Sequence, residues 1–420
     1  MAKHNTADTG KEISKKRKIK KEDDTTSLKK KSSIETRSET LTPILRVLTG
    51  SYEHQLLCLS LAASRSAFTH SSNIVSPSDK PTSPNVFTPI FHFAPHTASI
   101  RCIAHAKRYL VTGGNDEHIR LYDLQKRKEI GTLMHHEGSV TSLQFVKTAS
   151  GNSGKWLVSG GEDGKILIWR TKDWEVLADM KGHKGGVNDI AIHPSGKIAL
   201  SVGQDRTLRL WNLMTAKNAS VLKLPGPPAI QVSWNSAGDR YAVGWQRRIS
   251  IYDMNSKVLS TISLQSNLYK LDYGEIYEEE DISKDYLFYS DSNGKILCCD
   301  VAKATESEIP TLFELVAHTA RVKDFAFCTR QISATISGRS EADLGRKTTF
   351  MSSVSSDGKI VIWNIQSREP IAVYETGERL NCCSLVPEEV ERYDTMKRVR
   401  ETEEVDESES EDLEDGDGHQ

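Results

Sequence analysis

Short runs in which apolar and polar residues alternate recur along the middle of the chain. The runs that end at Trp169 and at Trp363 are two examples, and β-branched and aromatic residues predominate in each. Turns that contain glycine separate the runs. Alternation with a period of two between such turns is typical of β-strands with one face buried, so we expect an all-β fold.

The runs belong to a longer repeat with fixed internal spacing. A hydroxyl residue stands four places before an Asp, an aromatic residue stands six places after it, and a histidine precedes each set. These histidines are 40, 47 and 135 residues apart, and the last step is three times 45. The four sets are His96, Thr112, Asp116 and Tyr122; His136, Ser159, Asp163 and Trp169; His183, Ser201, Asp205 and Trp211; and His318, Ser353, Asp357 and Trp363.

Two weaker copies lie between His183 and His318. Gln246 takes the acid position in one of them and Asn293 in the other, and both copies lack the histidine and the hydroxyl. A period of about 40 to 45 residues with this layout is typical of four-stranded propeller blades. Over residues 44–386 the chain resembles the WD-repeat β-propeller family.

The repeat count predicts a seven-bladed propeller over residues 44–387. Six blades follow from residue 96 onward, and strands from both ends of this region can form a seventh blade that closes the ring. Closure leaves no open sheet edge that could promote aggregation. We expect inserted surface loops at about residues 64–84 and 329–347.

The recurring Ser, His and Asp could suggest a catalytic set. A nucleophile is activated once in one pocket, whereas this set occurs four times at blade spacing, so we interpret it as structural. The family resemblance implies a hydrogen-bond relay from Trp through Ser or Thr and His to Asp in each blade. No two of the four relay histidines have metal-ligand spacing such as His-x3-His, and no phosphate-binding loop or hydrolase motif is present. The sequence therefore predicts a non-enzymatic protein without metal, cofactor or small-molecule substrate.

The two ends of the chain carry opposite charges. Residues 1–37 hold twelve Lys or Arg against six Asp or Glu, and residues 401–420 hold eleven acids without a Lys or Arg. Such segments bury too little apolar surface to fold, so we expect residues 1–43 and 388–420 to be disordered tails. The densest basic cluster is a candidate nuclear-import signal or RNA contact, and its alternative is a solvated tail. Its residues are Lys15, Lys16, Arg17, Lys18, Lys20 and Lys21.

The longest apolar stretch, Leu56 to Ala63, is about eight residues long, whereas a membrane-spanning helix needs about twenty. The first forty residues are polar and lack the apolar core of a secretory signal. We therefore expect no membrane partner and a cytosolic or nuclear protein. The seven cysteines include no Cys-x-x-Cys pair and are expected to be free thiols.

Basic residues gather around the turns that open the third strand of each predicted blade. With one tryptophan they form a candidate partner-binding rim, which suits a phosphate backbone, an acidic protein segment or a phosphopeptide. The alternative is that these are ordinary polar turn residues of a propeller. The candidate rim consists of Lys165, Arg206, Trp245, Arg247, Arg248, Lys295 and Lys359.

Four strings make the resemblance more specific. Residues 182–187 read Gly-His-Lys-Gly-Gly-Val and residues 192–203 read Ile-His-Pro-Ser-Gly-Lys-Ile-Ala-Leu-Ser-Val-Gly. Residues 50–53 read Gly-Ser-Tyr-Glu and residues 321–324 read Arg-Val-Lys-Asp. These strings resemble the PAK-interacting, maintenance-of-killer branch of WD-repeat proteins.

That branch implies a nucleolar factor for assembly of the large ribosomal subunit, with pre-ribosomal proteins and ribosomal RNA as partners. It also implies an alternative role as a negative regulator of PAK-type kinases through direct binding. The inserted loops and charged tails depart from the family pattern, so their contacts are not implied by the resemblance.

Overall fold

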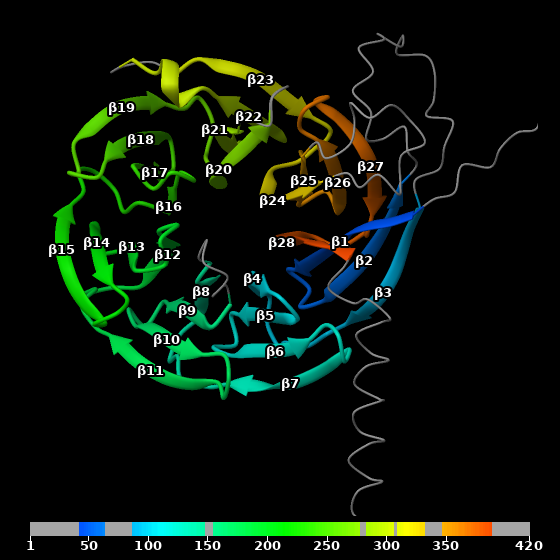
Figure 1. Ribbon diagram of the computed structural model, residues 1–420, viewed down its shortest axis with the longest axis horizontal. Coiled ribbons are helices and arrows are strands. Elements are labelled where there is room, and N and C mark those ends of the chain that lie inside the picture. Colours follow the sequence, from blue (N-terminus) through cyan, green and yellow to red (C-terminus); the bar gives the residue numbers. More distant parts are fainter. Residues whose placement is uncertain are drawn as a thin grey trace, which may run out of the picture. The chain divides into compact units, whose positions relative to one another are not determined.

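The computed structural model describes residues 42–63, 86–147, 154–277, 283–305, 309–331 and 347–388. All of them belong to the compact unit that begins at Glu39. They form seven antiparallel sheets of four strands each, arranged as blades around a central axis (Figure 1). This architecture confirms the predicted all-β, seven-bladed propeller.

Six blades are each built from four consecutive strands, and we number the blades in chain order. Within each of these blades the first strand is the innermost and the fourth is the outermost. Blade 1 contains β4 (Ile100–Ala106), β5 (Tyr109–Gly114), β6 (Ile119–Asp123) and β7 (Lys128–Leu133); blade 2 contains β8 (Val140–Phe145), β9 (Trp156–Gly161), β10 (Ile166–Arg170) and β11 (Glu175–Met180); blade 3 contains β12 (Val187–Ile192), β13 (Ile198–Gly203), β14 (Thr207–Asn212) and β15 (Lys217–Lys223). Blade 4 contains β16 (Gln231–Trp234), β17 (Arg240–Trp245), β18 (Arg248–Asp253) and β19 (Val258–Ser263); blade 5 contains β20 (Lys270–Tyr277), β21 (Ser283–Ser290), β22 (Lys295–Cys299) and β23 (Thr311–Val316); blade 6 contains β24 (Val322–Gln331), β25 (Lys347–Ser355), β26 (Lys359–Asn364) and β27 (Glu369–Glu375).

The seventh blade joins the two ends of the ring. Its innermost strand is β28 (Leu380–Pro387), which pairs with β1 (Thr42–Ser51), and β2 (Leu56–Ala63) and β3 (Val86–Phe93) complete the sheet. An ion pair of 2.8 Å between Arg46 and Glu388 also links the two ends. The strands of this blade lie where the sequence places them, and the ring has no open edge between its first and last strands.

The core lies between adjacent blades, which explains the burial of the inner strands. Leu48 and Cys58 of blade 7 pack with Ile100 and Leu110 of blade 1, and all four side chains are fully buried. The outermost strands face solvent on one side, and β15 is exposed over most of its length. Burial of apolar side chains between blades therefore supplies the main stabilisation of the ring.

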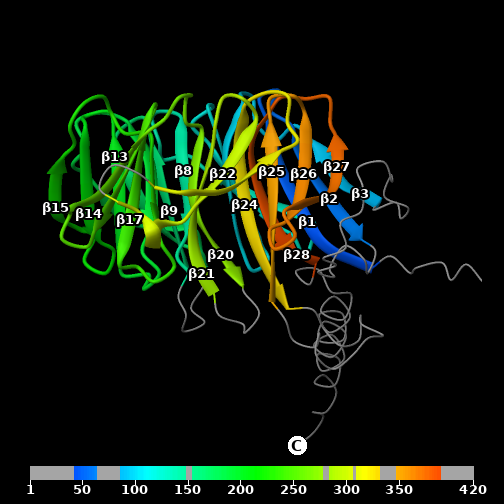
Figure 2. The same cartoon turned by 90° about the horizontal axis from the view of Figure 1, so that it is seen from above.

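The hairpin of β24 and β25 is longer than the sequence indicated. The two strands pair as far as Gln331 and Lys347, so strand occupies both margins of the insertion expected at 329–347. Thr329 opposite Thr349 continues the ladder because β-branched residues fit a pleated sheet. In the side view of Figure 2, β24 projects beyond most other strands at the lower edge. The insertion at 64–84, residues 1–41 and 389–420 of the tails, and the basic cluster from Lys15 to Lys21 lie outside the described residues. The expected tail boundaries are off by one or two residues, because Thr42 and Pro43 belong to β1 and Glu388 pairs with Arg46.

One complete helical segment lies within the described residues, a single 3-10 turn, η2 (Val301–Lys303). Within the described part of the chain, no helix is long and apolar enough to cross a membrane. All seven cysteines are free thiols, and six of them are buried.

Candidate functional site

Blades 1, 2, 3 and 6 carry the predicted relay sets, and blade 3 shows how the four residues of a set come together at one end of the blade. In blade 3, His183 Nδ1 lies 3.0 Å from Asp205 Oδ1, and His183 Nε2 lies 2.7 Å from Ser201 Oγ. The indole of Trp211 donates to the same Ser201 oxygen at 2.8 Å. The loop before the blade is thereby tied to the turn between its second and third strands.

Blade 2 repeats this arrangement at nearly equal distances. His136 Nδ1 lies 3.0 Å from Asp163 Oδ2, and His136 Nε2 lies 2.9 Å from Ser159 Oγ. Trp169 donates to Ser159 Oγ at 2.9 Å.

The relay requires a small residue two places after its serine or threonine, for steric reasons. A Cβ atom added to Gly203 would lie 2.6 Å from His183 Nδ1, so a larger residue there would displace the imidazole. The glycines at the same place in blades 1 and 2, Gly114 and Gly161, stand equally close to their histidines.

Electrostatics in the relay favour a neutral imidazole beside an ionised carboxylate. Burial lowers the pKa of His183, and Asp205 offsets only part of that effect. Burial alone would raise the pKa of Asp205, but hydrogen bonds from Lys184 N, Thr207 and His183 lower it to about 2. The buried carboxylate thus acts as a fixed hydrogen-bond acceptor, a structural role.

The relay of blade 1 stops at its threonine. His96 contacts Asp116 at 2.9 Å and Thr112 at 2.8 Å. The Tyr122 hydroxyl, however, is buried without a hydrogen-bond partner among the described residues, and the ring packs edge-on against Phe93. Burial raises the pKa of Tyr122, and the Thr112 hydroxyl nearby opposes part of that rise. Tyr122 therefore lies next to the relay threonine, but it makes no direct hydrogen bond of the kind that the tryptophans of blades 2 and 3 make.

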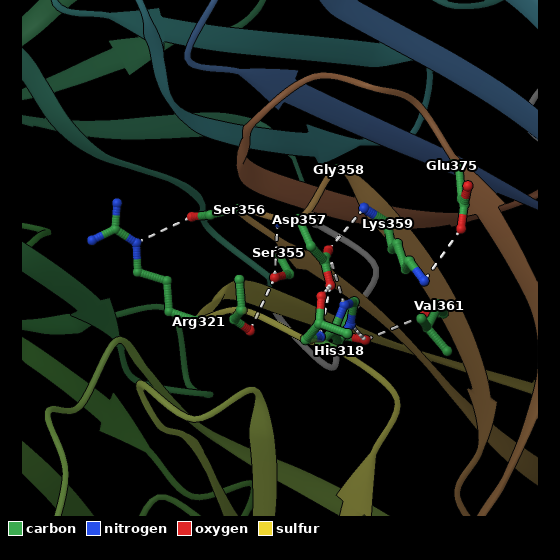
Figure 3. A network of polar contacts seen from close by, with 12 residues as sticks. His318, Arg321, Ser355, Ser356, Asp357, Gly358, Lys359, Val361 and Glu375 are labelled. Carbon is green, nitrogen blue, oxygen red and sulfur yellow. Dashed lines mark hydrogen bonds and ion pairs between the residues drawn. The ribbon is translucent and has the colours of Figure 1, made fainter.

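Blade 6 has a looser relay (Figure 3). His318 Nε2 lies 2.8 Å from Ser353 Oγ, and Trp363 donates to that oxygen at 2.9 Å. His318 Nδ1 is 3.5 Å from Asp357 Oδ1, an ion-pair distance that is too long for a good hydrogen bond. Asp357 is still held by the backbone N–H groups of Thr319 and Lys359, both at 2.9 Å.

Trp245 does not belong to a surface rim. It lies at the end of β17, opposite Arg248, and its side chain is only 2% exposed. In blade 3, Gly203 comes four residues after the residue that pairs with Trp211. In blade 4, Trp245 comes four residues after the residue that pairs with Tyr252, so it takes the place of that glycine. Blade 4 lacks a relay histidine, so a large side chain fits there. The prediction of an exposed tryptophan is therefore wrong, and Arg248 stacks on the indole with its guanidinium carbon 3.9 Å from the ring centre.

In blade 5 the acid of the turn is Asp291, two residues before the expected Asn293. Asp291 Oδ1 accepts hydrogen bonds from the backbone N–H groups of Asn293 and Lys295, both at 2.9 Å. The other carboxylate oxygen accepts from Ser266 Oγ at 3.2 Å. Asn293 thus contributes only its backbone N–H to the turn, and the carboxylate that accepts the hydrogen bonds of the turn is that of Asp291.

The three rim lysines each pair with a glutamate on a neighbouring segment. The Nζ to carboxylate distances are 3.0 Å for Lys165 with Glu137, 2.7 Å for Lys295 with Glu314 and 3.2 Å for Lys359 with Glu375. Arg206 and Arg247 are exposed, and Arg247 donates to Asn267 at 3.2 Å. The rim is therefore a mixed-charge surface, not the continuous basic band that the sequence suggested.

A polar ring around the central channel was not found from the sequence. Asp189 accepts from Ser142 Oγ at 3.0 Å, Asp272 accepts from Ser233 Oγ at 2.7 Å, and Lys270 Nζ lies 2.9 Å from Asp324. These contacts join inner strands of different blades. The sequence does contain a pattern that could have indicated these acids. Asp189 and Asp324 both stand two residues after the valine that opens an inner strand.

The ring lies beside a cavity of about 790 Å³ that Lys270, Asp272 and Asp324 help to line. Burial raises the pKa of Asp189 to about 6, although Lys270 and hydrogen bonds oppose this effect. Among the described residues, no three His, Cys, Asp or Glu side chains gather in a way that could hold a metal ion.

Comparison with known proteins identifies related chains. Residues 87–123, 127–170 and 174–212 match the family described as WD domain, G-beta repeat. The chain is 41% identical over 381 residues to Protein MAK11 of Saccharomyces cerevisiae, covering 84% of this chain and 86% of that protein. It is 34% identical to the p21-activated protein kinase-interacting protein 1-like of Gallus gallus over 68% of each chain. Shk1 kinase-binding protein 15 of Schizosaccharomyces pombe is 25% identical over 66% of this chain and 70% of that protein. The similarity thus extends well beyond the three matched repeats.

Proposed function

The chain belongs to the WD-repeat family of Protein MAK11 and the p21-activated protein kinase-interacting proteins, and we propose that it is a non-enzymatic scaffold in assembly of the large ribosomal subunit. The observation that carries this proposal is the 41% identity to Protein MAK11 across most of both chains. The family resemblance of the sequence implies the same role. Partners would be pre-ribosomal proteins and ribosomal RNA within precursor particles.

The relay geometry supports a scaffold over an enzyme. Each hydroxyl of a complete relay already accepts the N–H of a tryptophan and contacts a buried histidine, as Ser201 does with Trp211 and His183. A serine held in this way is not available to attack a substrate. Repeated across blades, the relays rigidify a platform.

We further propose that the chain acts in the nucleus and nucleolus. The basic cluster around Lys15 to Lys18 is of the kind that directs nuclear import, and a nucleolar address suits a factor for early ribosome precursors. These residues lie outside the described part of the chain.

Depletion of the protein from cells tests the assembly role. Precursors of large-subunit ribosomal RNA should accumulate and mature small-subunit RNA should stay normal, and the wild-type chain should rescue the defect. Rescue by a variant with an exposed substitution, Asp179→Ala, provides the matched control. Normal processing of large-subunit RNA after complete depletion would refute the proposal.

A second candidate is negative regulation of a PAK-type kinase by direct binding. The printed names of relatives favour it, since one relative is a p21-activated protein kinase-interacting protein and another a kinase-binding protein. This role predicts co-purification with a kinase that survives RNase treatment. Absence of a kinase from the material purified after RNase treatment would contradict this second role and leave ribosome assembly as the one remaining candidate.

A further inference from the structure

A group of cations lies at the entrance of the central channel, on the face that carries the relays. The cations are Arg321 and Lys323 at the start of β24 and Arg101 on β4, and the ring of Tyr269, just before β20, lies beside the first two. We call these four residues the channel mouth. The guanidinium carbon of Arg321 lies 5.7 Å from the centre of the Tyr269 ring, and Lys323 Nζ lies 5.2 Å from it. Three blades thus contribute to one compact positive site.

The charge of Arg321 and Lys323 is not balanced by a carboxylate. Arg321 Nε donates to Ser356 Oγ at 3.1 Å, and no ion pair joins Arg321 or Lys323 to an acid within the described ranges. Figure 3 shows Arg321 turned away from Asp357, whereas Lys359 reaches toward Glu375. The unbalanced pair therefore differs from the rim lysines, each of which has its glutamate.

Lys323 is the most constrained of these cations. Its side chain is partly buried, and burial together with the neighbouring Arg321 and Arg101 lowers the pKa of its ammonium group. Arg101 is itself paired with Glu162 at 2.5 Å. Arg321 and Lys323, which have no such counter-charge among the described residues, repel each other, and a bound anion relieves that repulsion.

We propose that the channel mouth binds an acidic segment of a protein partner, with a carboxylate side chain between Arg321 and Lys323. This inference goes beyond the proposed function, because it concerns the chemistry of the partner and holds for a ribosomal or a kinase partner. A carboxylate accepts charge-assisted hydrogen bonds from both cations.

Two observations favour a protein acid over a nucleic acid. Two cations already lie beside the Tyr269 ring, so a base that stacked on it would compete with them for the ring. The glutamates paired with Lys295 and Lys359 make the surrounding surface mixed in charge, whereas a phosphate backbone needs an extended positive track. A compact positive site instead suits a short cluster of acidic side chains.

Fluorescence anisotropy on the full-length chain with a labelled twelve-residue oligoglutamate tests this proposal. We expect saturable binding that weakens with added salt and falls about tenfold or more in the Arg321→Gln/Lys323→Gln variant. The matched control, Lys165→Gln/Lys359→Gln, also removes two positive charges from the same face and should bind within about twofold of wild type. Unchanged thermal unfolding shows that both variants are folded.

Four results would overturn the proposal. Oligoglutamate could fail to bind, or it could bind the mouth variant and wild type equally. A twelve-nucleotide oligouridylate that binds more tightly than oligoglutamate, with the loss confined to the mouth variant, would make the mouth an RNA contact. Binding that occurs only when the acids of residues 401–420 are replaced by their amides would mean that the chain's own acids occupy the mouth.

Discussion

Replacement of Asp205 by Ala should destabilise the propeller without touching a chemical step. Asp205 accepts hydrogen bonds from His183 Nδ1 at 3.0 Å, from Lys184 N at 3.0 Å and from the Thr207 hydroxyl at 2.7 Å. Its side chain is 9% exposed, so water can replace only part of these contacts. Alanine would leave several donors without an acceptor.

The pKa of Asp205 sets the scale of the loss. A decrease from 3.8 to about 2 corresponds to about 2 to 3 kcal/mol at neutral pH, and buried donors left unpaired keep the total near ~3 kcal/mol. At ~2.1 cal/mol/K per residue over roughly 300 ordered residues, this loss lowers Tm by about 5 °C. Because the folded-state pKa lies below the unfolded one, the contribution is complete above about pH 4 and is lost as pH falls through about 2.

Differential scanning calorimetry of wild type and variant at neutral pH measures this effect. The control is Asp179→Ala, which removes an exposed aspartate on β11 that forms an ion pair with Lys181 and should change Tm by less than about 1 °C. Equal Tm values for wild type and Asp205→Ala would refute the relay as a stabilising element.

Three further changes separate the roles of individual residues. Trp169→Phe should cost about 1 to 2 kcal/mol of unfolding free energy in denaturant titration, because Ser159 loses a donor. Tyr122→Phe should change that free energy by less than about 0.5 kcal/mol, because the Tyr122 hydroxyl makes no direct hydrogen bond; an equal loss in both variants would show that Tyr122 does take part in a relay. Trp245→Ala should cost about 3 to 5 kcal/mol by opening a cavity, and a loss below about 1 kcal/mol would contradict its place in the core. Replacing Lys15–Lys18 by Ala should reduce nuclear fluorescence of a tagged chain, and an undiminished nuclear signal would rule out the import role.

The fold could be predicted because its determinants are local and periodic. The offsets between Ser201, Asp205 and Trp211 recur in three other blades and fix the hairpin of each. Blades 4 and 5 lack the relay, yet alternation alone placed their strands. Closure by β28 and β1 followed from counting repeats, because a ring needs a whole number of blades.

The proposed binding surface could not be predicted from the sequence, because it depends on contacts between segments far apart in the chain. Lys359 and Glu375 meet across a strand pair, which removed a cation from the expected rim. Tyr269 and Arg321 meet only because blades 5 and 6 are neighbours in the ring. Trp245 follows a glycine at a turn, where an aromatic residue could be exposed or buried, and only the missing histidine of blade 4 provides the space that buries it.

Sucrose-gradient sedimentation of the tagged full-length chain from cell extract, with and without RNase, tests the scaffold role most directly. We predict that the protein sediments with precursors of the large ribosomal subunit and moves to the top of the gradient after RNase treatment. Sedimentation as a free monomer under both conditions would contradict the assembly role and favour kinase regulation.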